Sequence, residues 1–323
     1  MHPSNDGSAN FPDDFEERPE ITSQNEVELA RQWVEAASAG DFASAWAVSD
    51  LLRSARIDYS GRERWCCPLW DGSPIDHRDV LIRCWRGLGD AIHFIRYAPF
   101  VGSRASSLTV EAPTALLPLF RTVQGIDRLV ELDQGELEEK RYVEIETTEL
   151  PYVFRTTLDT IPCTTPYLDL PGPPEQAEKS ELAIGLCWCG GPYDPRRSMH
   201  LFDLEPLSVL SKASFFQLQR GGALQEIFGA PFRFRNPTDC SMDVYSTAAR
   251  IKSLDLVVSV DTMVAHLAGA LGKKVYLLLP ANADWRWLRN RDDSPWYPTM
   301  RLFRQSQTGD WAPVVTRLVE SLT

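Results

Sequence analysis

The strongest constraint on the fold is an alternation of short apolar runs with amphipathic segments, which occurs twice along the chain. Apolar runs of this length, bounded by turn residues, are typical of buried strands, and the segments between them have helical periodicity. The predicted strands are 79–85, 107–111 and 128–132 in the first set, and 182–188, 215–218, 255–260 and 274–279 in the second. The predicted helices are 91–101 and 115–123, then 203–211, 244–254 and 262–271. Strands that alternate with helices form parallel sheets, so the sequence predicts the α/β class with two Rossmann-like units.

The boundary between the two units is predicted at a proline-rich stretch. Pro171-Gly-Pro-Pro174 is followed by polar residues as far as Glu181, a composition typical of a linker. The length of 323 residues is also about twice that of a typical domain. We therefore expect one domain at 61–174, a second at 175–305, and a C-terminal segment at 306–323 that ends in a helix.

The N-terminal region differs from both units. Residues 1–24 are polar and acidic, so we expect a disordered tail. Within 25–60, apolar residues recur at helical spacing on either side of the turn Ala39-Gly40-Asp41, which predicts a helical hairpin. The hairpin resembles a single tetratricopeptide unit. Because one such pair of helices cannot bury a core alone, it must pack on its neighbour or on a partner.

The composition excludes several classes of partner and site. With 33 basic and 45 acidic side chains the net charge is −12, which disfavours nucleic acid as a partner. No apolar run approaches the ~18 residues of a transmembrane helix, and the acidic N-terminal stretch is not a secretory signal. We therefore expect a cytoplasmic protein, with peripheral membrane association left open. The seven cysteines lack C-x-x-C spacing, so buried reduced thiols are expected.

Three groups of residues lie at the carboxyl ends of predicted strands, where ligands bind in α/β folds. The first is Gly87-Leu-Gly89-Asp90, which follows the strand at 79–85. Ile92 replaces the third glycine of a dinucleotide fingerprint, which disfavours a nicotinamide-dependent oxidoreductase. Asp90 is then either a helix cap or a residue that lies at the ligand crevice.

The second group begins at Asp261, directly after the strand at 255–260. On the helix that follows, Thr262, His266 and Gly269 share the face opposite the apolar one. That face meets either solvent or a ligand. The free amides at the start of the helix suit a phosphate group.

The third group is the loop Cys189–Ser198. Gly190 and Gly191 allow a close backbone approach, and Arg197 and Ser198 can supply charge-assisted hydrogen bonds to a diphosphate. No Asp-x-Asp follows a predicted strand to hold a divalent metal on that diphosphate. We therefore expect no metal, with arginine and helix ends meeting the charge instead.

Several segments, taken together and in order, resemble one glycosyltransferase family. They are Arg86–Tyr97, Ile184–Gly190, Arg197-Ser198, Phe216–Gln219, Ser259–Ala270, Asp284–Leu288 and Ser294–Gln305. Over roughly residues 65–323 the chain resembles bacterial glycosyltransferase domains linked to tetratricopeptide repeats, which are distantly similar to the lipopolysaccharide heptosyltransferases of glycosyltransferase family 9. The resemblance implies a GT-B-like fold, in which two Rossmann-like domains face each other across a cleft and the last helix crosses back.

The resemblance also implies roles for particular residues. The first domain would bind the acceptor, with Asp90 as catalytic base and Gly89, His93 and Arg96 on the acceptor side. The second domain would bind the nucleotide-sugar donor through residues of the matching motifs, namely Gly190, Arg197, Ser198, Gln219, Asp261, Thr262 and His266. Asp261 is expected to cap its helix or to bind a sugar hydroxyl, because a carboxylate repels phosphate.

These roles predict an inverting, metal-independent glycosyltransferase that needs no cofactor besides the nucleotide-sugar. Asp90 would take the proton from a hydroxyl of a cell-envelope glycan or a protein, while Arg197 and Ser198 stabilise the departing phosphate. The chain departs from the residues usual in the family at Trp85-Arg86 and His93, and at Met263. The alternative is therefore a catalytically inactive GT-B-like protein that binds nucleotide or acts as a scaffold.

Overall fold

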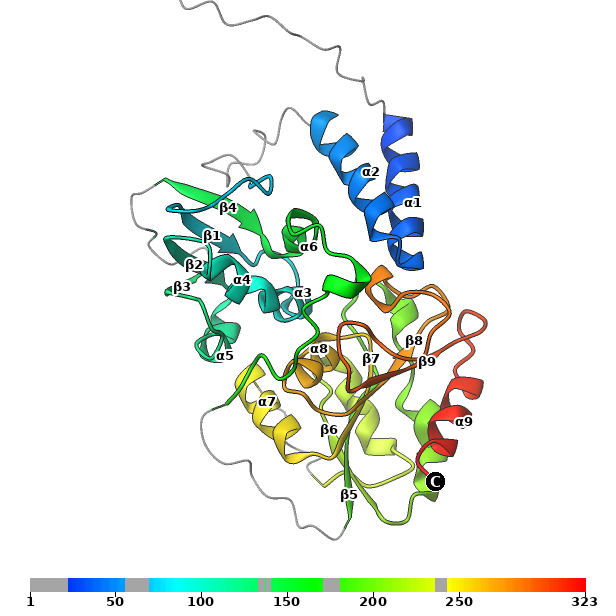
Figure 1. Ribbon diagram of the computed structural model, residues 1–323. Helices are drawn as coiled ribbons and strands as arrows, with labels where there is room; N and C mark the ends of the chain where they lie inside the picture. The colour runs from blue at the N-terminus through cyan, green and yellow to red at the C-terminus, as the bar shows by residue number, and fades with distance from the viewer. Residues whose placement is uncertain (1–22, 56–69, 133–136, 138–140, 171–180, 236–242) are drawn as a thin grey trace, which may run out of the picture.

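The computed structural model describes residues 23–55, 70–132, 137, 141–170, 181–235 and 243–323. The chain forms two parallel sheets with their helices, and an N-terminal helical hairpin (Figure 1). This is the predicted α/β architecture, and we refer to the parts built on the two sheets as the first and the second domain. The predicted tail up to residue 22 and the predicted linker at 171–174 lie outside the described residues.

The first sheet has four parallel strands in the order β3-β2-β1-β4. They are β1 (Asp79–Arg83), β2 (Ser107–Ala112), β3 (Arg128–Glu131) and β4 (Tyr142–Glu146). The strand β4 does not stand out in the sequence as an apolar run, because glutamates alternate with its apolar residues. In the fold, Arg83 donates to Glu144 at 2.9 Å and to Glu111 at 2.6 Å, so each of these buried carboxylates has a charged partner.

The helix predicted at 91–101 is broken into shorter pieces. It consists of α3 (Leu88–Phe94), the 3-10 turn η1 (Ile95–Tyr97) and α4 (Ala98–Gly102). Pro99 lies in the first turn of α4, where a helix tolerates proline, and this explains the break. The other elements of this domain are η2 (Thr114–Leu116), α5 (Leu117–Phe120), η3 (Thr147–Glu149), α6 (Leu150–Val153) and η4 (Leu158–Thr160).

The second sheet has five parallel strands in the order β6-β5-β7-β8-β9. They are β5 (Leu182–Cys187), β6 (Ala213–Gln217), β7 (Leu256–Val260), β8 (Val275–Leu279) and β9 (Met300–Arg304). The helical elements are η5 (Pro195–Arg197), η6 (Leu201–Val209), η7 (Gly222–Gly229), α7 (Val244–Ser253), α8 (Met263–Ala270), η8 (Trp285–Trp287) and α9 (Ala312–Glu320). The helix predicted at 203–211 is the 3-10 segment η6, which contains Pro206. All residues of β7 and β8 are buried, as in central strands covered on both faces.

The N-terminal hairpin is formed by α1 (Ser23–Ala39) and α2 (Phe42–Ala55). It contacts both domains. Trp33 lies against Trp285 of the second domain, with ring centroids 5.4 Å apart. Trp46 donates from Nε1 to the carbonyl of Thr156, in the first domain, at 2.7 Å. The hairpin therefore packs on its neighbours within the chain, and its likeness to a tetratricopeptide unit stays a prediction.

The last helix differs from the expectation that it crosses back to the first domain. Instead α9 lies beside the sheet of the second domain (Figure 1). Its apolar residues Val314, Val315 and Leu318 are buried in one cluster with Leu186 of β5 and Val258 of β7. The apolar face of α9 is thus already covered within its own domain.

Candidate active site between the domains

The two domains meet through the helices that follow inner strands of each sheet. The chain passes from β1 into α3 and from β7 into α8, and these two helices pack against each other near the centre of the molecule (Figure 1). Gly89 lies at the closest approach: a Cβ there would be 3.0 Å from His266 Cδ2 and 3.5 Å from Met263 Cα. A side chain would press the helices apart, so Gly89 allows the domains to meet.

Asp90 lies in the first turn of α3, at the domain boundary. It is not the helix cap, because Gly87 occupies the cap position and no side chain caps this helix. Instead, Asp90 Oδ1 accepts a hydrogen bond from Arg286 Nη2 of the second domain at 2.5 Å. The Asp90 side chain is 27% exposed. The cap alternative is therefore wrong, and Asp90 is a partly accessible carboxylate paired with a cation from the opposite domain.

Arg286 is a residue that the sequence analysis does not single out. It lies in η8, in the segment after β8, and its guanidinium is 3.2 Å from Asp284 Oδ1 and 5.1 Å from the ring centre of Phe94. Burial opposes its charge, but the carboxylates of Asp284, Asp90 and Asp261 together raise the pKa of Arg286. Its position after a parallel strand, within a segment already recognised as similar to the family, is the signal that could have identified it.

Asp261 is buried directly after β7, next to groups that raise its pKa and groups that lower it. Arg197 Nη1 donates to its carbonyl oxygen at 3.1 Å and lies 3.9 Å from Oδ2, while His266 Nε2 is 3.7 Å from Oδ1. Burial, and then the charge of Asp284, raises the pKa of Asp261 to about 6, although Arg197 acts in the opposite direction. The expected cap role belongs to Thr262 instead, whose Oγ1 accepts from a helix amide at 3.2 Å.

The face of α8 that carries His266 and Gly269 packs within the protein. The sequence alone leaves two alternatives for this face, contact with solvent or contact with a ligand. His266 Nδ1 and His93 Nδ1 both hydrogen-bond to the hydroxyl of Tyr297, at 3.0 and 2.9 Å. A Cβ on Gly269 would lie 2.5 Å from the Tyr297 ring. Burial above all, together with nearby arginines, keeps the pKa of both histidines well below the usual value, so both are neutral. The structure thus places His93 and His266 in the contact between the domains.

The glycine-containing loop after β5 lies on the start of α8. Ser198 Oγ accepts from Gly190 N at 3.0 Å, and a Cβ on Gly190 would be 3.6 Å from Thr262 Cγ2. Gln219 holds the loop from β6: its Oε1 accepts from two loop amides at 3.1 and 2.9 Å, and its Nε2 donates to two carbonyls at 3.1 and 2.8 Å. Gly190, Ser198 and Thr262 therefore come together as predicted for a donor site, whereas Gln219 shapes the loop.

Within the described part of the chain, Arg197 and Arg286 each have a buried donor without an acceptor, close to Asp261. Arg197 turns inward and its side chain is 25% exposed, whereas its neighbour Arg196 bonds Asp194 in solvent. The Nε atoms of Arg197 and Arg286 are buried and have no hydrogen-bond acceptor among the described residues. A buried donor without an acceptor costs free energy, which a bound acceptor would recover. Hydrogen bonds from a guanidinium to an anion are stronger than those between neutral groups. This arrangement suits a phosphate group.

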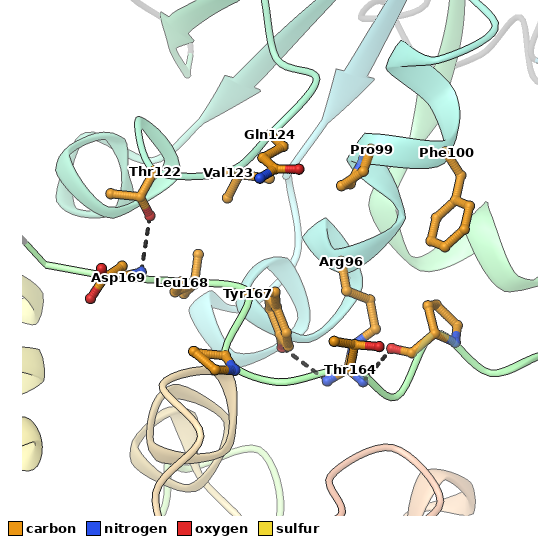
Figure 2. Close-up of a pocket in the computed structure, with 12 residues that line it drawn as sticks. Arg96, Pro99, Phe100, Thr122, Val123, Gln124, Thr164, Tyr167, Leu168 and Asp169 are labelled. Carbon is orange, nitrogen blue, oxygen red and sulfur yellow. Dashed lines mark hydrogen bonds between the residues drawn. The ribbon is translucent and has the colours of Figure 1, made fainter.

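Arg96, predicted on the acceptor side, is buried and serves the contact between the domains. It donates to the carbonyls of His93 and Trp296, at 2.7 and 2.6 Å, and to the hydroxyl of Tyr167 at 2.9 Å. Arg96 also lines a pocket of about 480 Å³ between α4, the loop after α5 and the segment 162–169, with Phe100 on its wall (Figure 2). The lining includes neither Asp90 nor any predicted donor residue, so this pocket is separate from the candidate site.

The part of the chain that the structure describes offers neither a metal site nor a membrane-spanning helix. No group of three or more His, Cys, Asp or Glu side chains there could hold a metal ion. No helix there has both the length and the apolar character needed to span a bilayer. Among the described cysteines, Cys84 and Cys187 are buried, Cys189 is partly exposed and Cys163 is exposed, so the expectation of buried thiols holds only in part.

Sequence comparison identifies one relative of the chain. No protein-family model matches it. Protein FlbA of Caulobacter vibrioides is 25% identical over 289 residues, which are 78% of this chain and 48% of FlbA. The chain thus spans about half the length of the curated relative that it matches.

Solved structures also resemble the chain. The ADP-heptose lipopolysaccharide heptosyltransferase II of E. coli is similar with a TM-score of 0.51 and 14% identity, covering 76% of this chain and 97% of that one. A glycosyltransferase of family 9 from Veillonella parvula has a TM-score of 0.49 and 12% identity, covering 73% and 88% of the two chains. The glycosyltransferase TibC of enterotoxigenic E. coli has a TM-score of 0.49 and 14% identity, covering 77% and 78%. The likeness to heptosyltransferase II confirms the expected fold: the chain has the two-domain, GT-B-like fold of the heptosyltransferases.

Proposed function

We propose that this chain is a glycosyltransferase that moves a sugar from a nucleotide-sugar to a hydroxyl of a cell-envelope glycan or a protein, with inversion at the anomeric carbon. The observation that supports the proposal most is the arrangement at the domain boundary. The first domain contributes the partly accessible carboxylate of Asp90. The second contributes two arginines with unpaired, buried Nε donors, next to the start of a helix. The carboxylate of the first domain suits a general base, and the arginines of the second domain suit the phosphates of the nucleotide-sugar.

On the donor side, the diphosphate would bind Arg197, Ser198 and the first amides of α8. The loop and the helix start are adjacent, as the contact of Gly190 with Thr262 shows. The partial positive charge of a helix N-terminus adds to that of the guanidinium groups. Asp261, which is buried and has a raised pKa, would bind a sugar hydroxyl next to the phosphates.

On the acceptor side, Asp90 would act as the general base. It accepts the proton of the hydroxyl while the hydroxyl oxygen forms a bond to the anomeric carbon. The bond from that carbon to the donor phosphate breaks, and the phosphate oxygen leaves with the bonding electrons. A positioned base contributes ~10² to 10⁴ in rate. Stabilisation of the charge on the leaving phosphate by Arg197 and Arg286 supplies the electrostatic contribution.

The donor half of the proposal is tested by nucleotide binding. Arg197→Ala should weaken the binding of nucleoside diphosphates by about tenfold or more, because a hydrogen bond to a charged group contributes ~1.5–3 kcal/mol. Arg196→Ala is the matched control, since it removes the same charge one residue away, from a side chain that bonds Asp194 in solvent. Calorimetric titration with ADP, GDP, UDP and CDP measures both variants. Equal losses in the two variants, or no binding to the parent at millimolar concentration, would contradict the donor site.

The proposed reaction needs no metal, and chelation tests this. The described residues hold no carboxylate and histidine cluster for a metal, and Arg197, Arg286 and the start of α8 can meet the charge of a diphosphate. Transfer should therefore be unchanged in EDTA. If EDTA abolished transfer and Mg²⁺ or Mn²⁺ restored it, the charge assignment to the arginines would be wrong.

One observation favours the alternative of a nucleotide-binding protein without turnover. Asp90 accepts a hydrogen bond from Arg286, so the proposed base already has a charged partner within the protein. Free nucleotide released from a nucleotide-sugar, in the presence of acceptor, separates the two functions. A chain that binds nucleotide but never releases it from a donor would be a binding protein.

A further inference from the structure

The proposed base is held by a residue of the opposite domain. Arg286 Nη2 lies 2.5 Å from Asp90 Oδ1, and the two side chains are 14% and 27% exposed. A partly buried pair of this kind is screened less than one on the surface. An acceptor hydroxyl that approaches Asp90 therefore meets a carboxylate whose Oδ1 already accepts from a guanidinium.

Arg286 has a donor left over for a second acceptor. Its Nε is buried and has no acceptor among the described residues, and the same is true of Arg197 Nε, whose guanidinium lies 3.9 Å from Asp261 Oδ2. A diphosphate carries more negative charge than one carboxylate, and its oxygens can accept from two guanidinium N–H groups at once. Asp284 Oδ1 lies 3.2 Å from Arg286 Nη1, so the guanidinium has a second carboxylate beside it, in addition to Asp90.

We propose that Arg286 acts as a gate on Asp90, which opens when the nucleotide-sugar binds. This inference rests on the proposed function, in which Asp90 is the base and the second domain binds the donor. Without donor, Arg286 holds the Asp90 carboxylate. When the nucleotide-sugar binds, its diphosphate draws the guanidinium away, and Asp90 becomes free to accept the proton of the acceptor. Arg286 is thus a phosphate ligand and a positioning residue for the base.

The gate makes Asp90 and the diphosphate competitors for one guanidinium. Removing the charge of Asp90 should release Arg286 and so strengthen diphosphate binding, because coupling between two sites is reciprocal. Direct repulsion between the Asp90 carboxylate and the phosphates would also make diphosphate binding stronger when the charge of Asp90 is removed. The two causes differ in one respect: repulsion persists without Arg286, whereas competition disappears.

A double-mutant cycle tests the gate by calorimetric titration with inorganic pyrophosphate and with ADP, GDP, UDP and CDP. Asp90→Asn should bind these ligands about five- to tenfold more tightly than the parent, in the lower part of the range for such coupling. Arg286→Gln should bind them more weakly, and adding Asp90→Asn to it should change nothing further. Arg286→Met, whose apolar side chain can pack on the Phe94 ring in place of the guanidinium, replaces Arg286→Gln if that variant does not fold.

Asp293→Asn is the matched control for charge. Asp293 pairs with Arg291 at the same distance of 2.5 Å, but its side chain is 64% exposed, and this variant should bind like the parent. The gate is contradicted if Asp90→Asn does not bind more tightly, if Asp293→Asn gains as much, or if the gain persists without Arg286. Nucleotide binding to the parent together with any of these results would reject the gate alone. No binding of any ligand to the parent would reject the gate and the proposed function together.

Discussion

At the scale of single residues, the buried carboxyl of Asp261 makes the stability of the chain depend on pH. Its pKa is raised from 3.8 to about 6 in the folded state. Between these values the folded state holds more protons than the unfolded state, so stability falls as pH rises. The favourable contribution of the protonated carboxyl is present below pH 3.8 and is lost as the pH passes through about 6.

Asp261→Asn should remove this dependence. The free energy of unfolding of the variant, relative to the parent, should increase by up to about 3 kcal/mol between about pH 4 and pH 7, because one pKa unit corresponds to about 1.4 kcal/mol. Urea unfolding at several pH values measures the difference. Asp293→Asn is the control, because its arginine neighbour lowers the pKa of Asp293 and no increase is expected. A difference that stays flat for Asp261→Asn would contradict the burial of a titrating carboxyl.

The candidate site could be predicted in part, because strand ends can be recognised in a sequence. Gly190, Ser198 and Thr262 follow strands of one parallel sheet and meet in the fold. His266 and Arg96 were expected to meet ligands, but they are buried where the domains touch. Helical periodicity identifies the face on which a residue lies. It contains no information on whether another domain covers that face.

At the scale of elements, the packing of α8 against Tyr297 depends on the absence of a side chain at Gly269. Alanine favours a helix over glycine by ~1 kcal/mol, so Gly269→Ala would stabilise α8 in isolation. In the fold, however, the new Cβ would lie 2.5 Å from the ring of Tyr297, which two histidines hold in place. Overpacking of this kind costs ~1–3 kcal/mol. The expected net result is a loss of about 1 kcal/mol in the free energy of unfolding.

Urea unfolding of Gly269→Ala and Gly222→Ala checks this balance. A Cβ on Gly222 would have nothing within 4 Å, so that variant should be at least as stable as the parent. If Gly269→Ala were the more stable protein, α8 and the Tyr297 ring would not be in close contact.

Local patterns predicted most elements and missed those whose environment is set by distant residues. The strands β1 to β3 and β5 to β8 were predicted from their own residues. The strand β4 was not singled out, because its buried Glu144 is neutralised by Arg83 from another strand. The position of α9 was wrong, because its apolar face could cover either domain and only the assembled second sheet decides between them.

At the scale of the whole molecule, the N-terminal hairpin contacts both domains close to the site. Trp33 of α1 packs on Trp285, which precedes Arg286 in η8, and Trp46 of α2 bonds the first domain. The hairpin therefore supports the segment that carries the proposed gate. An arrangement of this kind follows from contacts among three parts of the chain, so no single stretch of sequence predicts it.

The central claim is that Asp90, at the boundary between the domains, is the base for sugar transfer. The most direct measurement is the release of nucleotide from a panel of nucleotide-sugars, with glycan and protein acceptors, by the parent and by Asp90→Asn. The account predicts that the variant unfolds cooperatively, still binds nucleoside diphosphates, and loses turnover by at least ~10². Near-parental turnover in a folded Asp90→Asn protein would contradict the claim.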